Sequence, residues 1–304
     1  MSLVARLTRF VVRHVLRRWF FGADVARMRR RERTPRLPAS ATVKEVQAGG
    51  VPALSIEPPG ASDRVLLYLH GGGFAICSPE THGRLAHGIA RAAGARTLLP
   101  RYRLAPEHPF PAALDDCVAS YRWLLGEGFS PGRIAIAGDS AGGNLALATL
   151  LTLREAGDPL PAAVLTIAPV TDFTFPIEPA ALRREAFLDP RFLFEVPAWY
   201  LGTADPSLPR VSPALGDLRG LPPLLLHVGS EELLLDDNRR FVERARAAGV
   251  DATMKVWDGL WHVFHLFDFV PEARRAIAEL GAFVRERSPD APAGAAPPPA
   301  RPAA

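Results

Sequence analysis

Short, almost wholly apolar runs recur along the body of the chain. Six of them predict buried strands, and two weaker early runs predict an antiparallel edge. Strands that are apolar on both sides belong to a sheet that is covered on both faces. The six runs are Val65–His70, Thr97–Pro100, Ile134–Asp139, Val164–Ala168, Leu224–Val228 and Thr253–Trp257, and the two weaker ones are Val43–Gln47 and Ala53–Glu57.

Segments with helical spacing separate these strands. The alternation of strand and helix predicts an α/β fold with a mostly parallel, eight-stranded sheet flanked by helices. A chain of 304 residues with 48% hydrophobic residues can bury one large core. The predicted helices are Thr81–Ala93, Ala112–Glu127, Ala141–Glu155, Asp237–Ala248 and Pro271–Arg287.

Three segments depart from this rhythm. Residues 172–218 form a long insertion, rich in proline and aromatic residues, which predicts a lid or a pocket wall. Residues 288–304 are mostly proline and alanine, which predicts a disordered tail. We therefore expect an N-terminal segment at 1–40, a main α/β domain at 41–287 that carries the insertion, and the tail. The N-terminal segment ends in a proline-containing linker, Thr34 to Ser40.

The first residues predict a basic amphipathic helix. Its apolar residues lie at helical spacing, opposite several arginines. Such a helix either packs its apolar face on the α/β domain as part of a lid or lies on an anionic membrane. We expect packing on the domain, with membrane contact as the less favoured alternative. The spaced residues are Leu3, Leu7, Phe10, Val11, His14 and Val15.

Charge is distributed unevenly along the chain. Residues 1–36 contain eleven arginines against Asp24 and Glu32, a net charge of +9. Because the whole chain carries +4, the remainder carries −5. A mildly acidic body argues against a nucleic-acid partner.

The cysteine content and the hydropathy of the chain bear on its cellular compartment and on metal binding. Cys77 and Cys117 are forty residues apart, which is neither a disulfide framework nor a metal-ligand spacing. Arginines interrupt the apolar N-terminus, unlike a secretory signal, and no segment approaches the ~18 continuous apolar residues of a membrane span. We expect a cytoplasmic protein, a monomer or homodimer, that uses no metal and no cofactor.

A G-x-S-x-G motif at residues 138–142 predicts a catalytic nucleophile, Ser140. A buried strand precedes the motif and a helix follows it, which is the strand-turn-helix that exposes a nucleophilic serine. Gly138 and Gly142 remove side chains where strand and helix approach. A serine that merely caps a helix does not need a glycine on each side.

Three consecutive glycines after His70 predict an oxyanion hole. Glycines leave backbone N–H groups free to point into a pocket, where they bind the oxyanion together with the amide of Ala141, the residue after the nucleophile. A phosphate-binding loop is disfavoured because no Lys-Ser/Thr pair follows. We expect His70 to support the loop structurally and not to act as a base.

The base and the acid come from later loops. Among the histidines after Ser140, His227 lies within a predicted strand, whereas His262 follows the last strand across a short loop, and we favour it over His265. The acid comes from the loop after Leu224–Val228. Physical reasoning alone does not separate Glu231 from Glu232 in that loop, whereas a neighbouring aspartate, Asp236, suits a helix cap.

Together these motifs resemble the hormone-sensitive-lipase-like family of bacterial esterases, also called family IV carboxylesterases. The resemblance covers roughly residues 60 to 287. It implies an α/β-hydrolase fold, with Ser140 as nucleophile and His262 as base. The segments that carry it are His70–Phe74, Tyr102–Glu107, Gly138–Gly143 and Trp261–Phe264.

The resemblance also implies the remaining site residues. The amides of Gly71, Gly72 and Ala141 correspond to the oxyanion donors. The family's acid motif, Asp-Pro-Leu followed by Asp, matches Glu232–Asp236 here with a glutamate in place of the aspartate and no proline, which favours Glu232 as the acid. A lid built from residues 1–40 and 172–218 would place four aromatic residues in the pocket wall or, equally, in the core: Phe74, Phe192, Trp199 and Tyr200.

These observations predict a serine carboxylesterase that hydrolyses short- to medium-chain acyl esters through an acyl-enzyme intermediate. Its partner is a small-molecule ester. A lactone hydrolase or a deacetylase uses the same triad, and the motifs do not separate these activities. A catalytically silent ligand receptor on the same fold is disfavoured, because such a protein would be expected to lose its nucleophile or its base.

Overall fold

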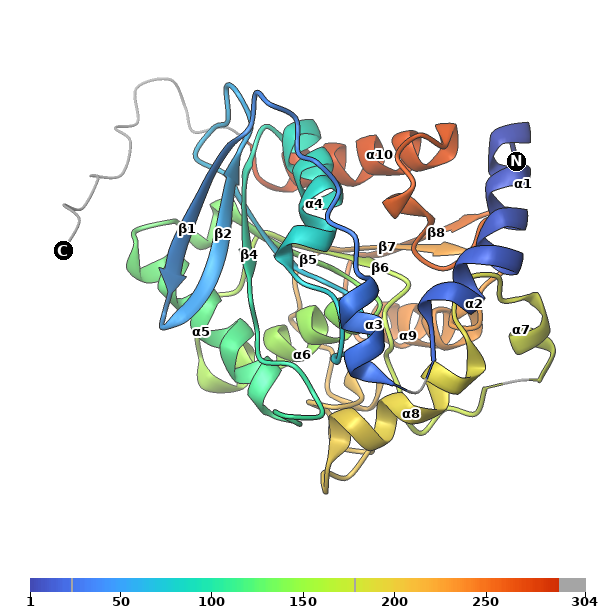
Figure 1. Ribbon diagram of the computed structural model, residues 1–304. Coiled ribbons are helices and arrows are strands. Elements are labelled where there is room, and N and C mark those ends of the chain that lie inside the picture. The colour runs from blue at the N-terminus through green and yellow to red at the C-terminus, as the bar shows by residue number, and fades with distance from the viewer. Residues whose placement is uncertain (23, 178, 290–304) are drawn as a thin grey trace.

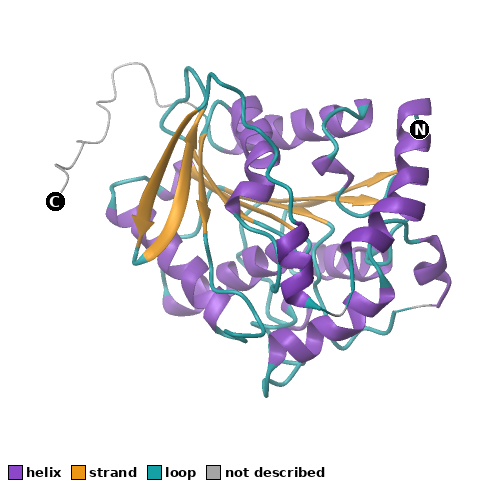
Figure 2. Cartoon of the chain, viewed as in Figure 1, coloured by secondary structure: helices purple, strands orange, loops and turns teal. Residues whose placement is uncertain are grey.

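The computed structural model describes residues 1–22, 24–177 and 179–289. One eight-stranded sheet forms its centre, with strand order β1-β2-β4-β3-β5-β6-β7-β8 (Figures 1 and 2). The six strands from β4 to β8 in this order run parallel, and β2 pairs antiparallel with both β1 and β4. The predicted fold class is confirmed. The strands are β1 (Thr42–Ala48), β2 (Val51–Glu57), β3 (Val65–Leu69), β4 (Arg96–Pro100), β5 (Ile134–Asp139), β6 (Ala163–Ile167), β7 (Leu224–Gly229) and β8 (Ala252–Trp257).

Helices cover both faces of this sheet (Figure 2). On one face α4 (Pro79–Ala93) packs against α10 (Pro271–Arg287), and on the other lie α5 (Ala112–Gly126), α6 (Ala141–Ala156) and α9 (Leu235–Ala247). Successive strand residues serve the two faces alternately, as the pleat requires. Leu67 packs in the core on the α6 side, whereas Leu66 packs with α4 and α10.

The N-terminal segment forms a bent helix and a second short one. The first comprises α1 (Leu3–Val11), a π-helical turn at Val12–Leu16 and α2 (Arg17–Phe20), and the second is α3 (Val25–Arg31). The insertion contains α7 (Pro179–Arg184) and α8 (Pro190–Leu201). Sequence patterning gave no separate prediction for these three helices: α3 and α7 have only seven and six residues, and α8 carries Pro197 in its interior.

The predicted packing of the N-terminal apolar face is wrong. Leu3 is 72% exposed, Leu7 60% and Phe10 63%, while Ala5 and Val12 on the other side of the helix are buried. Ala5 and Val12 pack in a small cluster with the loop after β8. The helix therefore docks through its small residues and presents its large apolar residues to solvent.

The end of the catalytic body extends slightly beyond its predicted limit. Ser288 is buried, and its hydroxyl donates to the Gly132 carbonyl at 2.8 Å. The rest of the predicted tail, residues 290–304, lies outside the described residues. No helix within the described ranges is long and apolar enough to cross a membrane.

Candidate active site

Ser140 lies between the end of β5 and the start of α6. Its backbone has φ 51° and ψ −118°, an unusual conformation for a residue with a side chain. The Ser140 N–H donates to the Ile167 carbonyl of β6 at 2.8 Å, and its own carbonyl accepts from the Asn144 N–H at 3.1 Å. These contacts hold the turn in the strained form that the G-x-S-x-G motif predicts.

Two glycines make this turn sterically feasible. A Cβ on Gly138 would lie 2.3 Å from the Gly142 carbonyl oxygen, and one on Gly142 would lie 2.0 Å from the Leu69 carbonyl oxygen. Both partners are backbone atoms that cannot move aside. The glycines therefore allow β5, α6 and the end of β3 to meet at the serine.

His262 and Glu232 form a buried pair. His262 Nδ1 lies 2.7 Å from Glu232 Oε2, and the Gly229 N–H donates to Glu232 Oε1 at 2.5 Å. Both side chains are at most 2% exposed. Among the described residues, His262 Nε2 has no hydrogen-bond partner, and this nitrogen belongs to a ring that lines the same cavity as Ser140. The pair thus leaves the distal ring nitrogen available to a proton donor in the cavity.

The electrostatics of His262 favour its charged form. Burial alone would lower the pKa of His262, but the hydrogen bond and charge of Glu232 raise it, and the charges of Glu185 and Asp139 add to this. The net pKa of His262 is raised above its ordinary value. An imidazole that gains a proton during a reaction is therefore stabilised here.

The other predicted candidates for base and acid have different partners. His227 is fully buried in β7, and its Nδ1 lies 3.3 Å from His265 Nε2. Glu231 forms an ion pair with Arg9 of the N-terminal helix at 2.6 Å. Asp236 pairs with Arg239, at 2.9 Å, within the first turn of α9. Only Glu232 among these carboxylates contacts His262 in the described part of the chain.

The glycine loop after β3 requires a correction. The Gly71 N–H donates to Asp139 Oδ1 at 3.1 Å, and this amide is therefore not available to an oxyanion. Gly72 and Gly73 line the cavity beside Ser140, and their N–H groups donate to no acceptor among the described residues. The assignment of Gly71 as an oxyanion donor is wrong, because its N–H already donates a hydrogen bond to the Asp139 carboxylate, next to the nucleophile.

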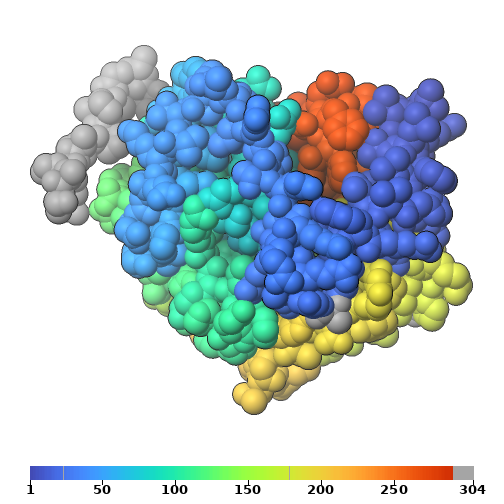
Figure 3. Space-filling view, viewed as in Figure 1, coloured from blue at the N-terminus to red at the C-terminus, as the bar shows by residue number. Residues whose placement is uncertain are grey.

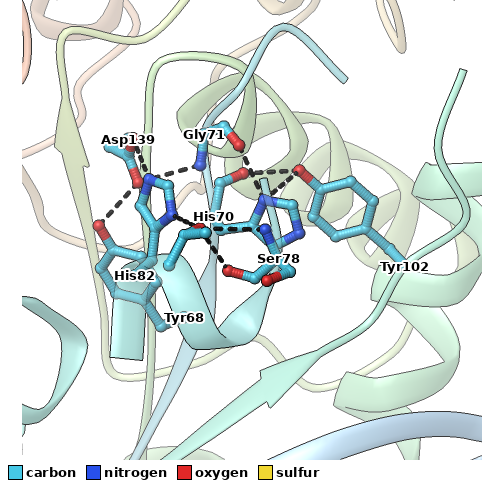
Figure 4. Close-up of polar contacts among 8 residues, drawn as sticks. Tyr68, His70, Gly71, Ser78, His82, Tyr102 and Asp139 are labelled. Atoms are coloured by element: carbon cyan, nitrogen blue, oxygen red, sulfur yellow. Dashed lines mark hydrogen bonds and ion pairs between the residues drawn. The ribbon is translucent and has the colours of Figure 1, made fainter. Parts of the chain in front are cut away.

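Sequence reasoning missed the buried network around Asp139 (Figure 4). Asp139 Oδ1 also accepts from the Tyr68 hydroxyl at 2.8 Å, and Oδ2 lies 3.3 Å from His82 Nε2. Burial would raise the pKa of Asp139, but His82 and the Tyr68 hydrogen bond lower it overall. A Cβ on Gly71 would lie 2.1 Å from Asp139 Oδ2. The G-x-S-x-G motif shows that Asp139 precedes Ser140, but it does not show that Asp139 holds the glycine loop through the Gly71 N–H.

His70 supports the same loop from its other side, as predicted. Its Nδ1 lies 2.7 Å from the Gly71 carbonyl oxygen, and the Tyr102 hydroxyl donates to the His70 carbonyl at 2.7 Å (Figure 4). The two rings stack at 4.2 Å between centroids. Burial, together with the charge of His82, lowers the pKa of His70 to about 3, so that the ring is neutral near pH 7.

A cavity of about 250 Å³ opens beside Ser140 and His262. Of the four aromatic candidates for pocket wall or core, Phe192 lines the cavity, Phe74 and Tyr200 pack in the core, and Trp199 is partly buried against it. Phe74 and Tyr200 stack at 3.6 Å and are almost fully buried, and Trp199 packs edge-on against Phe192. Within the described ranges, no group of three or more His, Cys, Asp or Glu residues could hold a metal ion.

Much of the cavity wall comes from segments far away in the sequence. The N-terminal segment lies across the face shown in Figure 3, bordered by the insertion and by the C-terminal helix. Glu32, just after α3, accepts from the Cys77 N–H at 2.7 Å and so ties that segment to the loop near the glycines. Leu16, Trp19, Phe20, Phe21, Glu32, Phe187 and Leu188 line the cavity from these two segments.

Comparison with known proteins identifies the family. Residues 66–266 match a family model described as the alpha/beta hydrolase fold. The chain is similar to a solved esterase of the bacterial hormone-sensitive lipase family, with 42% identity and a TM-score of 0.90, over 94% of this chain and 99% of that one. The chain belongs to the hormone-sensitive-lipase-like esterases of the α/β-hydrolase fold. As a member of this family, it is a hydrolase of carboxylic esters.

Named relatives of this hormone-sensitive-lipase-like esterase come from several bacteria. An acetyl-hydrolase from Streptomyces hygroscopicus is 47% identical over 243 residues, covering 79% of this chain and 81% of the relative. An esterase from Acinetobacter venetianus is 36% identical, covering 79% and 81%. The resemblance drawn from the four motifs is confirmed over most of the chain.

Proposed function

We propose that this carboxylesterase cleaves short- to medium-chain acyl esters, with Ser140 as nucleophile, His262 as base and Glu232 as the acid that orients it. The observation that carries this proposal is the 2.7 Å contact between Glu232 Oε2 and His262 Nδ1. The other ring nitrogen, His262 Nε2, has no hydrogen-bond partner among the described residues, and its ring lines the same cavity as Ser140. This geometry supports proton transfer from the Ser140 hydroxyl to His262 Nε2.

The reaction then proceeds in two halves. Ser140 Oγ attacks the ester carbonyl, and the resulting oxyanion accepts hydrogen bonds from the amides of Gly72, Gly73 and Ala141, the last at the positive end of the α6 dipole. His262 returns its proton to the leaving alcohol, which leaves an acyl-enzyme. Water attacks the acyl carbon with His262 again as base; the bond from that carbon to Ser140 Oγ then breaks, His262 gives the proton to Ser140, and the acid product leaves. Glu232 stabilises the imidazolium without taking its proton.

The cavity supports small acyl groups. Its volume of about 250 Å³ is below the range of roughly 300–1,000 Å³ of sites for drug-sized ligands. The name of the relative from S. hygroscopicus, acetyl-hydrolase, favours an acetyl group in particular. A panel of p-nitrophenyl esters of increasing chain length, with a lactone and an N-acetylated amine, therefore separates the acetyl-ester, lactonase and deacetylase activities.

The assignment of the nucleophile has a direct test. Ser140→Ala is expected to reduce kcat on p-nitrophenyl acetate to the background rate, because the attacking oxygen is lost, while the circular dichroism spectrum stays the same. Ser207→Ala is the matched control, since Ser207 is exposed and hydrogen-bonds only to Asp205 in the described structure. Substantial turnover by Ser140→Ala contradicts the proposal.

A further inference from the structure

The N-terminal helix displays a continuous apolar stripe to solvent. We call this the apolar stripe and define it by six residues of α1 and the π-helical turn that are 42–72% exposed. Their spacing of three, four and seven places them on one side of the helix. Ala5 and Val12 lie on the opposite side and are fully buried. The stripe consists of Leu3, Val4, Leu7, Phe10, Val11 and Val15.

The orientation of this helix is fixed by polar contacts along its buried side. The Ser2 hydroxyl donates to Glu272 at 2.9 Å, and Arg9 pairs with Glu231 at 2.6 Å. Arg17 donates to the Glu185 carbonyl at 2.9 Å. Turning the stripe inward would break these contacts and leave two carboxylates without their partners. The outward position of six large apolar side chains is therefore a stable feature of the fold.

Exposed arginines that form no ion pair in the described part of the chain lie on the same N-terminal helix and on α3. Arg6 and Arg18 on the same helix and Arg27 and Arg30 on α3 are exposed and form no ion pair among the described residues. Residues 1–36 carry a net charge of +9 against −5 for the rest of the chain. If a second copy of the chain packed stripe to stripe, the two basic segments of residues 1–36 would lie close together and repel each other. An anionic surface complements both the apolar and the basic groups.

The same helix continues into the wall of the cavity. Leu16, Trp19 and Phe20 line the cavity near Ser140, and Trp19 is 40% exposed. Tryptophan is enriched where one part of a side chain meets lipid and another meets water. A surface that received the stripe would thus lie beside the opening of the active site.

We infer that residues 3–20 bind an anionic lipid surface in the plane of its headgroups. The stripe enters the boundary between headgroups and acyl chains, and the arginines contact lipid phosphates. On the basis of the proposed esterase activity, amphiphilic acyl esters pass from that surface past Trp19 to Ser140.

The test is co-sedimentation of the full chain with vesicles of phosphatidylcholine alone or phosphatidylcholine mixed with phosphatidylglycerol. Wild-type protein is expected to bind the mixed vesicles and to dissociate as salt rises. Val11→Glu is expected to weaken this binding about tenfold or more, since it places a carboxylate in the apolar boundary. Val43→Glu on β1 is the matched control, because Val11 and Val43 are both 44% exposed.

A second variant tests the basic component. Arg6→Gln combined with Arg18→Gln is expected to weaken binding about thirtyfold, because each basic residue near an anionic membrane contributes about fivefold in affinity. Hydrolysis of p-nitrophenyl acetate in buffer is expected to stay unchanged in Val11→Glu, so that a failure of the esterase and a failure of lipid binding are distinguished.

Three results overturn the inference. The first is no binding of wild type to mixed vesicles, and the second is equal binding to neutral and mixed vesicles. The third is a dimer in light scattering that Val11→Glu dissociates, which would assign the stripe to an interface between two copies.

Discussion

Glu231 and Glu232 are adjacent in the sequence, but their different environments give them different roles. Glu232 is 1% exposed and contacts His262, whereas Glu231 is partly exposed and pairs with Arg9. A buried carboxylate that touches an imidazole can orient it and stabilise its charge. A partly exposed ion pair contributes little to stability, about 0–1 kcal/mol. We therefore expect substitution of Glu232 to lower kcat far more than substitution of Glu231.

Exchange of each glutamate for glutamine measures this difference. Glu232→Gln is expected to lower kcat on p-nitrophenyl acetate by roughly 10³- to 10⁴-fold, because the amide opposite Nδ1 favours the wrong tautomer of His262. Glu231→Gln is the control and is expected to change kcat less than about fivefold, since Glu231 pairs with Arg9 and does not contact His262.

The pH profile of Glu232→Gln provides a second readout. His262 acts as a base only when neutral, so kcat/KM falls as pH drops through its pKa. Glu232 raises that pKa in the wild type, so its loss is expected to move the acid limb of residual activity to lower pH. A larger loss of kcat in Glu231→Gln, or an acid limb that does not move, contradicts the assignment.

Site residues could be predicted from the sequence where the residues that define their role are close in the chain, and not where those residues are remote. Ser140 was identifiable because its motif, strand and helix are contiguous in the chain. Gly71 was misassigned because the acceptor of its N–H, Asp139, is 68 residues away. Likewise Glu231 and Glu232 became distinguishable only through contacts with His262 and Arg9, which are remote in sequence.

The meeting of β3, β5 and α6 is the element on which the site depends. The strand β5 brings Ser140 to the carboxyl edge of the sheet, and the parallel neighbour β3 brings the glycine loop to the same edge. Ligand sites in open α/β sheets lie at this edge. The absence of a Cβ at Gly142 lets the start of α6 approach the Leu69 carbonyl.

Gly142→Ala tests this close approach. Its Cβ would lie 2.0 Å from a backbone oxygen, so the free energy of unfolding is expected to fall by about 3 kcal/mol or more. Gly126→Ala at the end of α5 is the control. Nothing lies within 4 Å of its new Cβ, and better helix propensity is expected to raise stability by up to about 1 kcal/mol. Urea unfolding measures both, and equal stabilities of the two variants would contradict the steric argument.

At the level of elements, continuous apolar runs predicted the strands well because both faces of the sheet are covered. The N-terminal helix was misjudged for a related reason. Its periodicity correctly predicted an amphipathic helix. We assumed that the face with the large apolar residues packs inward, whereas that face is exposed to solvent. Ala5 and Val12 are small enough to let the helix approach the loop after β8, and Arg9 fixes its rotation.

Over the whole molecule, the active site combines groups from the N-terminal segment, from the insertion and from the loop after β8. Glu185 of the insertion accepts from the Leu233 N–H at 3.3 Å, and its carbonyl accepts from Arg17. Burial raises the pKa of Glu185. The segments that wall the cavity are thus linked to the loop that carries Glu232, an arrangement that no local sequence pattern could predict.

The central claim is that Ser140 carries the acyl group, and mass spectrometry tests it most directly. Cys77 is an alternative nucleophile in the same cavity, although burial raises its pKa well above the ordinary value and keeps it a thiol. The protein is mixed with p-nitrophenyl butyrate, quenched in acid and digested. The account predicts one butyryl group on the peptide that contains Ser140 and none in Ser140→Ala. A butyryl group on Cys77, retained in Ser140→Ala, would contradict it.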